Sequence, residues 1–395
     1  MPAQTTTQTA TRGFPEEEFQ ARLVNAQARM HTGEMDGIVL TTPQNFRYFS
    51  GFDSQFWESP TRPFFIVVPR QGDPIGVVPS IGGPALAATW IDDVRTWPAP
   101  CPEDDGVSLL NSVLSSLPRR FGRIGWEMGR ESIIRMPIVD FDRLRQASSL
   151  DFIDASPLIW SLRMVKSERE IEKVREACRI GSDTFDLFLQ RVTYGLSEVE
   201  MAREFRKLAF ECGADNAPFV SVCSGQGGYA QIIAGPAETR QTDGQIMFID
   251  TGLQFDAYFC DFDRNFAFGH IDDEAQRAHE VVWNATQAGI DAARPGITAG
   301  DLWAAQQRVL SAAGANSGND VGRSGHGLGL HLTEPPSNMP GDNTVLEAGM
   351  IMTIEPGFEY APGKTIVHEE NLLITGDGCE LLTRRAPREM PVIAA

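Results

Sequence analysis

The 395-residue sequence is poor in positive charge and lacks the features of secreted, membrane-spanning or disulfide-bonded proteins. Its 34 Lys and Arg residues face 53 Asp and Glu residues, and the net charge of −19 argues against nucleic-acid or acidic-membrane partners. No apolar run approaches the ~18 residues of a membrane span, and the first residues contain no apolar segment typical of a signal peptide. The six cysteines form no CxxC pair, which favours reduced thiols and a cytoplasmic location.

The length of the chain predicts two domains, because one ordinary core rarely grows so large. Residues 1–13 are rich in Thr and Gln, and we expect them to be disordered. Residues 14–160 alternate helical and strand patterns, which predicts an α/β domain. Its predicted elements are a helix over Pro15–Met35, a turn at Pro43–Asn45, and strands at 37–40, 63–69, 74–79, 122–126 and 151–153.

A change of pattern near residue 161 predicts the start of a second domain that continues to residue 395. Ser167 followed by Glu170 is typical of a capping box, here at the start of a long helix that reaches about Val192. Further helices are predicted over 197–212 and 273–293. The glycine-rich segment 224–228 lacks the spacing of a phosphate-binding loop, so we interpret it as a turn.

A proline-containing loop in the first domain, residues 52–63, carries Phe56, Trp57 and Arg62. Two interpretations remain open. The loop either packs on its own aromatic rings, or it binds a ligand or a second subunit, for which exposed aromatics and an arginine are suited.

The segment Ile246–Gly269 predicts a β-hairpin with an aspartate on each side of the turn. Asp250 ends one apolar run and Asp261 ends the returning one. Desolvating an unpaired carboxylate costs several kcal/mol, so each needs a cation, a donor network or a metal ion. Asp263, two residues further on, is expected to pair with Arg264 or with water.

Three later segments add polar side chains in apolar or glycine-rich surroundings. His326 lies in a glycine-flanked segment, Glu355 ends the apolar run 349–357, and Glu369 lies in a predicted strand over 366–375. Such an oxygen-rich set suits two divalent ions such as Mn, Fe, Co or Zn. Two ions would acidify a water molecule and stabilise a tetrahedral intermediate.

The motifs DTG-x(8)-D, GHGLGL, IEPG and EENLLIT occur in this order, and together they resemble those of the pita-bread metallohydrolases. This family, peptidase M24, includes aminopeptidase P, prolidase and creatinase. The resemblance covers about residues 160–395 by motif, and the first domain is similar in layout to the smaller domain of the prolidase and creatinase branch. It implies an α+β pita-bread domain, a homodimer and five metal ligands: Asp250, Asp261, His326, Glu355 and Glu369.

The sequence departs from the peptidases of this family at positions that contact their substrates. Tyr229 lies in the segment where a histidine is usual, and Thr333 replaces a second active-site histidine. Val367 replaces a common arginine, and His331 and His368 are new. Either these two histidines replace the missing hydrogen-bond donors, or the substrate is not an ordinary peptide.

These observations predict a metal-dependent hydrolase that cleaves an amide-type C–N bond in an Xaa-Pro-like dipeptide or a small non-peptide amide. Glu355 would shuttle the proton, as the resemblance implies. The other catalytic candidates are His331, Glu334 and His368, and the substrate-binding candidates are Phe56, Trp57, Arg62, Tyr229 and Thr333. The alternatives are a metal-dependent lyase acting on a zwitterion such as dimethylsulfoniopropionate, and a non-catalytic pita-bread binding module.

Overall fold

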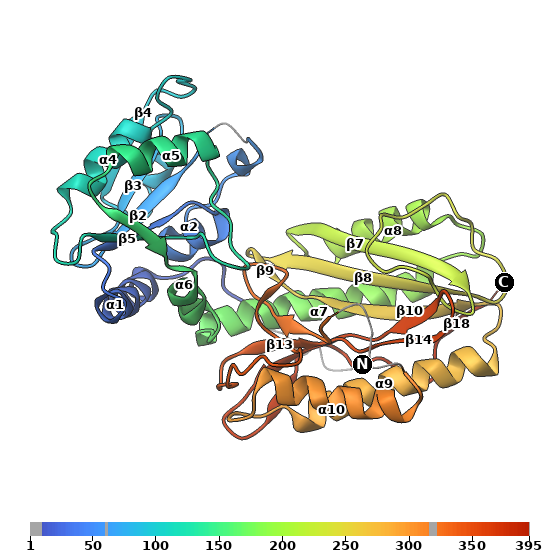
Figure 1. Ribbon diagram of the computed structural model, residues 1–395. Coiled ribbons are helices and arrows are strands. Elements are labelled where there is room, and N and C mark those ends of the chain that lie inside the picture. The colour runs from blue at the N-terminus through green and yellow to red at the C-terminus, as the bar shows by residue number, and fades with distance from the viewer. Residues whose placement is uncertain (1–9, 60–61, 316–321, 395) are drawn as a thin grey trace, which may run out of the picture. The chain divides into compact units, whose positions relative to one another are not determined.

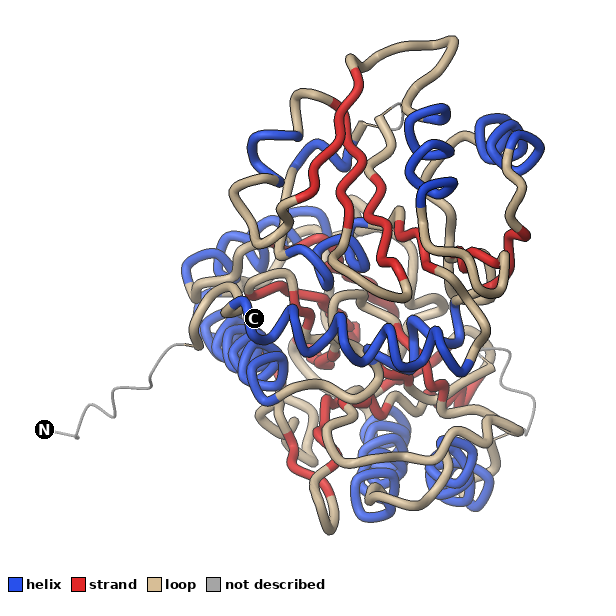
Figure 2. The backbone as a smooth tube through the Cα atoms, turned by 90° about the vertical axis from the view of Figure 1, so that its left-hand side faces the viewer, coloured by secondary structure: helices blue, strands red, loops and turns tan. Residues whose placement is uncertain are grey.

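The computed structural model describes residues 10–59, 62–315 and 322–394, and the chain separates into two compact units. Among the described residues, those from 13 to 163 form the smaller unit, and residues 10–12 join those from 164 to 394 in the larger one. Both units combine helices and strands (Figures 1 and 2). The disorder predicted for residues 1–9 lies outside the described residues. Arg12 pairs with Asp215, with 2.6 Å between Nη1 and Oδ2.

The smaller unit contains a six-stranded mixed sheet with the order β4-β3-β2-β1-β5-β6. Its strands are β1 (Gly37–Leu40), β2 (Phe65–Pro69), β3 (Ile75–Pro79), β4 (Asp93–Trp97), β5 (Arg123–Trp126) and β6 (Asp151–Asp154). The five predicted strands are confirmed. β4 was not predicted, because only Trp97 of its five side chains is buried and the strand has no apolar run.

The helices of the smaller unit include one that the sequence analysis interpreted wrongly as a turn. They are α1 (Glu16–Thr32), α2 (Pro43–Ser50), the 3-10 helix η1 (Gln55–Glu58), α3 (Gly83–Leu86), α4 (Val107–Ser116), α5 (Ile138–Ala147) and α6 (Ser156–Arg163). Pro43 begins α2 instead of a turn, since proline suits the first helical position. The buried carboxylate of Glu127 accepts hydrogen bonds from Thr42 Oγ1 and from Asn45 Nδ2, at 2.5 and 2.6 Å, and so holds this helix start.

We expect Asp36→Ala to destabilise the smaller unit by about 3 kcal/mol, because it leaves three partly buried backbone donors without their partner. The Asp36 carboxylate accepts from the amides of Arg120, Phe121 and Gly122 at 2.9, 3.0 and 2.7 Å. Burial raises its pKa, but these amides outweigh that effect and hold the pKa below its usual value. Its stabilisation is therefore present above the ordinary aspartate pKa and is lost as the pH falls through the lower folded value.

Urea unfolding of the full chain at neutral and acidic pH tests this expectation, with the exposed Asp73→Ala as the matched control. Equal unfolding midpoints for the two variants at neutral pH would contradict it.

The larger unit contains two five-stranded sheets and a two-stranded one. The first sheet has the order β18-β10-β8-β7, with β9 paired to β8; the second has the order β12-β11-β13-β16-β17, and β14 pairs with β15. The strands are β7 (Asn216–Gln226), β8 (Gln245–Phe255), β9 (Tyr258–Phe259), β10 (Phe262–Phe268), β11 (His326–Gly327), β12 (Glu334–Ser337), β13 (Ile351–Ile354), β14 (Gly357–Ala361), β15 (Lys364–Val367), β16 (Glu370–Ile374), β17 (Cys379–Leu381) and β18 (Val392–Ile393).

Helices cover the sheets of the larger unit and bury the apolar faces of their strands. They are α7 (Glu168–Arg191), α8 (Glu198–Glu211), α9 (Asp273–Ala292) and α10 (Ala299–Ala312). α7 packs on β8 and α8 on β7, whereas α9 contacts β13, β14 and β15 and lies beside α10 (Figure 1). The predicted capping box of Ser167 and Glu170 is confirmed at the start of α7. Among the described residues, no helix combines the length and the apolar composition that a membrane crossing needs.

Two predicted elements of the larger unit were partly wrong. The predicted strand over 366–375 is two strands, β15 and β16, interrupted at His368 and Glu369. The predicted turn over 224–228 begins later, because β7 continues to Gln226 by pairing with β8. Gly225 allows the close approach that follows, since a side chain there would lie 2.2 Å from the carbonyl oxygen of Gly228.

Candidate metal centre

The predicted hairpin that carries the two aspartates is confirmed, with β8 antiparallel to β9 and to β10. Asp256 and Ala257 form the tight turn with φ of 48° and 69°, a conformation that suits a two-residue hairpin turn. Asp250 lies in β8 and is buried. Asp261 directly precedes β10, and its backbone amide donates to Asn371 Oδ1 at 2.9 Å.

The second sheet supplies the remaining three candidate ligands. His326 lies in β11, Glu355 directly follows β13, and Glu369 directly precedes β16. β13 and β16 are antiparallel with Ile354 opposite Glu370, so Glu355 and Glu369 leave the two strands at the same end. Because the chain breaks between β15 and β16, Glu369 belongs to neither strand and lies beside the other candidate ligands.

Asp261, His326 and Glu369 come together in one buried cluster. Each offers a ligand atom within 4.8 Å of those of the other two, and His326 Nε2 lies 3.5 Å from Asp261 Oδ2. His326 Nδ1 donates to the carbonyl oxygen of Gly327 at 2.9 Å. Because a carbonyl oxygen can only accept, the proton is on Nδ1, and Nε2 is left with a lone pair for a metal ion.

The electrostatics of the cluster require a cation. Burial, with the charge of Glu355, raises the pKa of Asp250 well above its ordinary value. Burial and the neighbouring carboxylates raise the pKa of Asp261 and Glu369 in the same way. Burial also raises the pKa of Glu355 to about 7 and lowers that of His326 to about 4. Crowded carboxylates beside a neutral imidazole repel one another unless a positive ion lies between them.

The unpaired atoms of the site fit divalent ions. Asp250 Oδ1 and Glu369 Oε1 are buried and have no hydrogen-bond partner among the described residues. Buried carboxylate oxygens are normally hydrogen-bonded or ligated. Hard oxygen donors with one imidazole are the ligands that Mn, Fe, Co and Zn accept.

Two further catalytic candidates lie on the segment that follows His326. His331 is half-exposed; its backbone amide donates to Glu334 Oε1 at 3.1 Å, and its Nδ1 lies 3.9 Å from the same oxygen. Glu334 is buried in β12 and forms an ion pair with Lys166, with 3.1 Å between Oε2 and Nζ. Thr333 lies between them and is half-buried. The sequence analysis missed Lys166, because no local pattern marks a partner 168 residues away.

His368 faces away from the ligand cluster although it is next to Glu369. Its Nδ1 lies 3.2 Å from Thr286 Oγ1 in α9, and its Nε2 lies 3.1 Å from Arg385 Nη1. Neighbouring side chains of an extended segment point to opposite sides. Burial, with the nearby arginine charge, holds the pKa of His368 well below its usual value, so this imidazole is neutral.

Tyr229, a substrate-binding candidate, lies in the core of the larger unit. Its hydroxyl donates to Asn265 Oδ1 at 3.0 Å and accepts from the amide of Val367 at 2.6 Å. Its ring lies 4.9 Å from that of Phe248. These contacts are those of a packing residue.

The aromatic loop of the smaller unit packs both on itself and on neighbouring residues of the same unit. Arg62 lies over the ring of Phe56 at 4.9 Å, and Trp57 lies 4.8 Å from the ring of Phe64. Arg135 lies over the ring of Trp57, 5.2 Å from its centre. All these contacts are made within the smaller unit.

Of the two partners expected for the Asp263 side chain, Arg264 and water, the pairing with Arg264 was wrong. Arg264 donates instead to the backbone oxygen of Asp263 and forms an ion pair with Glu370, with 3.1 Å between Nη2 and Oε2. The Asp263 carboxylate is completely buried, and neither of its oxygens has a hydrogen-bond partner among the described residues.

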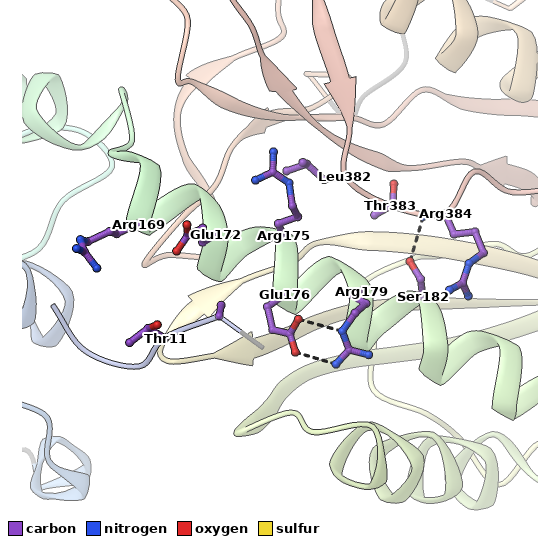
Figure 3. A pocket seen from close by; sticks show the side chains of 11 residues that line it. Thr11, Arg169, Glu172, Arg175, Glu176, Arg179, Ser182, Leu382, Thr383 and Arg384 are labelled. Atoms are coloured by element: carbon purple, nitrogen blue, oxygen red, sulfur yellow. Dashed lines mark hydrogen bonds and ion pairs between the residues drawn. The ribbon is translucent and has the colours of Figure 1, made fainter. Parts of the chain in front are cut away.

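An open pocket of about 740 Å³ lies over α7, away from the candidate ligands (Figure 3). Its lining includes Arg175, Arg179 and Arg384. Each is already paired with a carboxylate, as Figure 3 shows for Arg179 and Glu176. Their charges are therefore compensated, and the buried cluster is the better candidate for chemistry.

Comparisons with known proteins identify the family of the chain. Metallopeptidase family M24 matches residues 172–376, and the Creatinase/Prolidase N-terminal domain matches residues 22–165. The probable dipeptidase PepE of Mycobacterium tuberculosis is 27% identical over 395 residues, covering 97% of this chain and 99% of that protein.

Solved structures show the same two-domain architecture. Dipeptidase PepE from Mycobacterium ulcerans has a TM-score of 0.84 at 25% identity, covering 97% of this chain and 100% of that one. The dipeptidase from Pyrococcus horikoshii has a TM-score of 0.83 at 26% identity, covering 94% and 99%. The predicted fold, an α/β domain followed by an α+β pita-bread domain, is confirmed. The chain belongs to metallopeptidase family M24 and is a metal-dependent hydrolase of the aminopeptidase P and prolidase type.

Proposed function

We propose that this enzyme hydrolyses the amide bond of a dipeptide, with Xaa-Pro dipeptides as the first candidates, at a centre of two divalent ions. The observation that carries the proposal is the buried cluster of Asp261, His326 and Glu369. Asp250 and Glu355 complete the five-residue set that the sequence motifs imply. The relatives named dipeptidase support a short peptide as the substrate. Carboxylates with one histidine suit manganese, which we propose as the resident metal.

The five residues would hold the ions, which when bound would acidify a water molecule and polarise the substrate carbonyl. The protein side chains then have separate tasks. Glu355 accepts the proton of the attacking water and returns it to the leaving nitrogen. His331 is exposed enough to donate a hydrogen bond to the substrate, and Glu334 holds its backbone in place.

The replaced histidines narrow the substrate range. Thr333 offers a weaker and shorter donor than the histidine that is usual at this position, so a second donor must come from His331 or from the substrate itself. A small substrate with few contacts beyond the ions is therefore favoured over a long peptide. We also propose a homodimer in the cytoplasm, where the six free cysteines would stay reduced.

We expect the enzyme to lose its activity and part of its thermal stability when a chelator removes its metal, and to regain both with Mn²⁺. An ion present at 100 times its Kd would stabilise the larger unit by about 2.7 kcal/mol. Activity against Xaa-Pro dipeptides, the unfolding midpoint and the metal content per chain are the three measurements. A purified protein that contains no metal and gains no stability from Mn, Fe, Co or Zn would contradict the proposal.

Hydrolysis and the elimination catalysed by a lyase can be distinguished by their products. Hydrolysis incorporates solvent oxygen into the product acid, whereas elimination gives an unsaturated product with no added oxygen. Mass spectrometry in ¹⁸O-labelled water therefore decides between the two reactions.

A further inference from the structure

The carboxylate of Asp263 has no task in the site described so far, although its burial is complete. Its exposed fraction is 0%, and neither Oδ1 nor Oδ2 has a hydrogen-bond partner in the described part of the chain. The guanidinium of Arg264, the next residue, is directed to Glu370 and to backbone oxygens. Burying a charged carboxylate without a partner is strongly unfavourable, so Asp263 either takes up a proton or has a cation bound beside it.

The register of the hairpin places Asp263 beside the candidate ligands. Asp263 in β10 is directly opposite Asp250 in β8. Opposite residues of an antiparallel pair lie on one face of the sheet, with their Cβ atoms about 5 Å apart. Asp250 Oδ1 also lacks a hydrogen-bond partner among the described residues, so two adjacent buried carboxylates both have oxygens without partners. Asp261 lies two residues before Asp263, which is the spacing of side chains on one face of an extended strand.

Asn265 is the next residue on this face, and its neutral amide finds hydrogen-bond partners in the surrounding protein, whereas the carboxylate of Asp263 does not. Asn265 Nδ2 donates to the carbonyl oxygen of Val367 at 2.6 Å, and Asn265 Oδ1 accepts from the Tyr229 hydroxyl at 3.0 Å. That hydroxyl proton is thereby used and is not available to Asp263. Besides the Arg264 charge, which is paired with Glu370, the charges that act on Asp263 are carboxylates such as Asp250 and Glu355, and they repel it unless cations are bound.

We propose that Asp263 is a further carboxylate of the metal centre, in addition to the five residues of the ligand set, and that its charge strengthens the binding of the ion next to Asp250. The inference rests on the metal centre of the proposed function. Affinity for hard divalent ions rises with the number of carboxylate charges around them. A carboxylate that supports the ligands of a metal ion typically changes its affinity by about 10- to 100-fold.

Asp263→Asn removes the charge and keeps the shape of the side chain. In the full chain, stripped of metal by a chelator, we expect this variant to bind Mn²⁺ at least about 10-fold more weakly in calorimetric titration. We expect its metal-free unfolding midpoint to equal or exceed that of the wild type, because a buried unpaired carboxylate has been removed. Asp263→Ser also lacks the charge and gives the same comparison if the first variant does not fold.

The matched control is Asp256→Asn in the same hairpin. Asp256 is also a buried carboxylate, but it has its own cation, with 2.7 Å between Oδ2 and Lys173 Nζ. We expect this control to unfold at a lower temperature and to bind Mn²⁺ with the affinity of the wild type. Unchanged Mn²⁺ affinity in the Asp263 variants would overturn the inference alone. A wild-type protein that binds no Mn²⁺ would instead contradict the proposed metal centre, so the two failures are distinguishable.

Discussion

Glu355→Gln is expected to lower kcat/KM for dipeptide hydrolysis by about 1,000-fold, near the middle of the range for a lost general acid-base group. The amide keeps the size of the side chain but cannot take up a proton, and it also weakens the ligand set. The metal content of the variant, measured beside its activity, separates these two effects. A variant that keeps its metal but loses its activity assigns the proton transfer to Glu355.

Glu359→Gln is the matched control for this substitution. Glu359 lies four residues further on, in β14, is exposed, and accepts a hydrogen bond from the amide of Gly363 at 2.9 Å. We expect its kcat/KM to stay within a factor of two or so of the wild type, since surface substitutions of this kind change little. Equal activities of Glu355→Gln and Glu359→Gln would remove Glu355 from the mechanism.

His331→Ala is expected to lower kcat by about 100-fold, the typical effect of losing one hydrogen-bond donor to the transition state. The half-exposed imidazole is the candidate replacement for the histidine that Thr333 displaces. Thr333→His, introduced into the His331→Ala variant, is expected to recover much of the lost activity by supplying the donor at the usual position. Steady-state kinetics on Xaa-Pro dipeptides measure both effects.

His270→Ala is the control for a histidine outside the site. His270 is exposed and lies 3.0 Å from Asp243 Oδ2. We expect no change in kcat from this substitution. If His331→Ala is as active as His270→Ala, the substrate receives its hydrogen bonds without His331, and the interpretation of this residue as a donor fails.

The candidate metal ligands could be singled out from the sequence because each lies in a recognisable local pattern. Asp250, Glu355 and Glu369 each interrupt an apolar run, and a charge in such a run needs a partner whatever the rest of the fold is. The start of α7 was predictable for a similar reason, since Ser167 and Glu170 satisfy the first turn of their own helix.

The parts that were not predictable depend on residues far apart in the sequence. Lys166 meets Glu334 only after the sheets of the larger unit have formed. His368 could have faced either side of its segment, and packing against α9 decides which. Asp263 is a case of the same kind, because the guanidinium of its neighbour Arg264 forms its ion pair with Glu370 instead. A local sequence pattern does not indicate which of several distant residues a side chain will pair with.

Residues 10–12 belong to the larger unit, and this has a consequence for the order in which contacts form during translation. Arg12 pairs with Asp215, and the carbonyl oxygen of Thr11 accepts from Lys173 Nζ, so both partners follow the whole smaller unit in the chain. During synthesis from the N-terminus, the smaller unit is complete before either partner has left the ribosome. The smaller unit is thus, in chain order, an insertion within the larger one. The catalytic half of the protein can make these two contacts only after its second part has been translated.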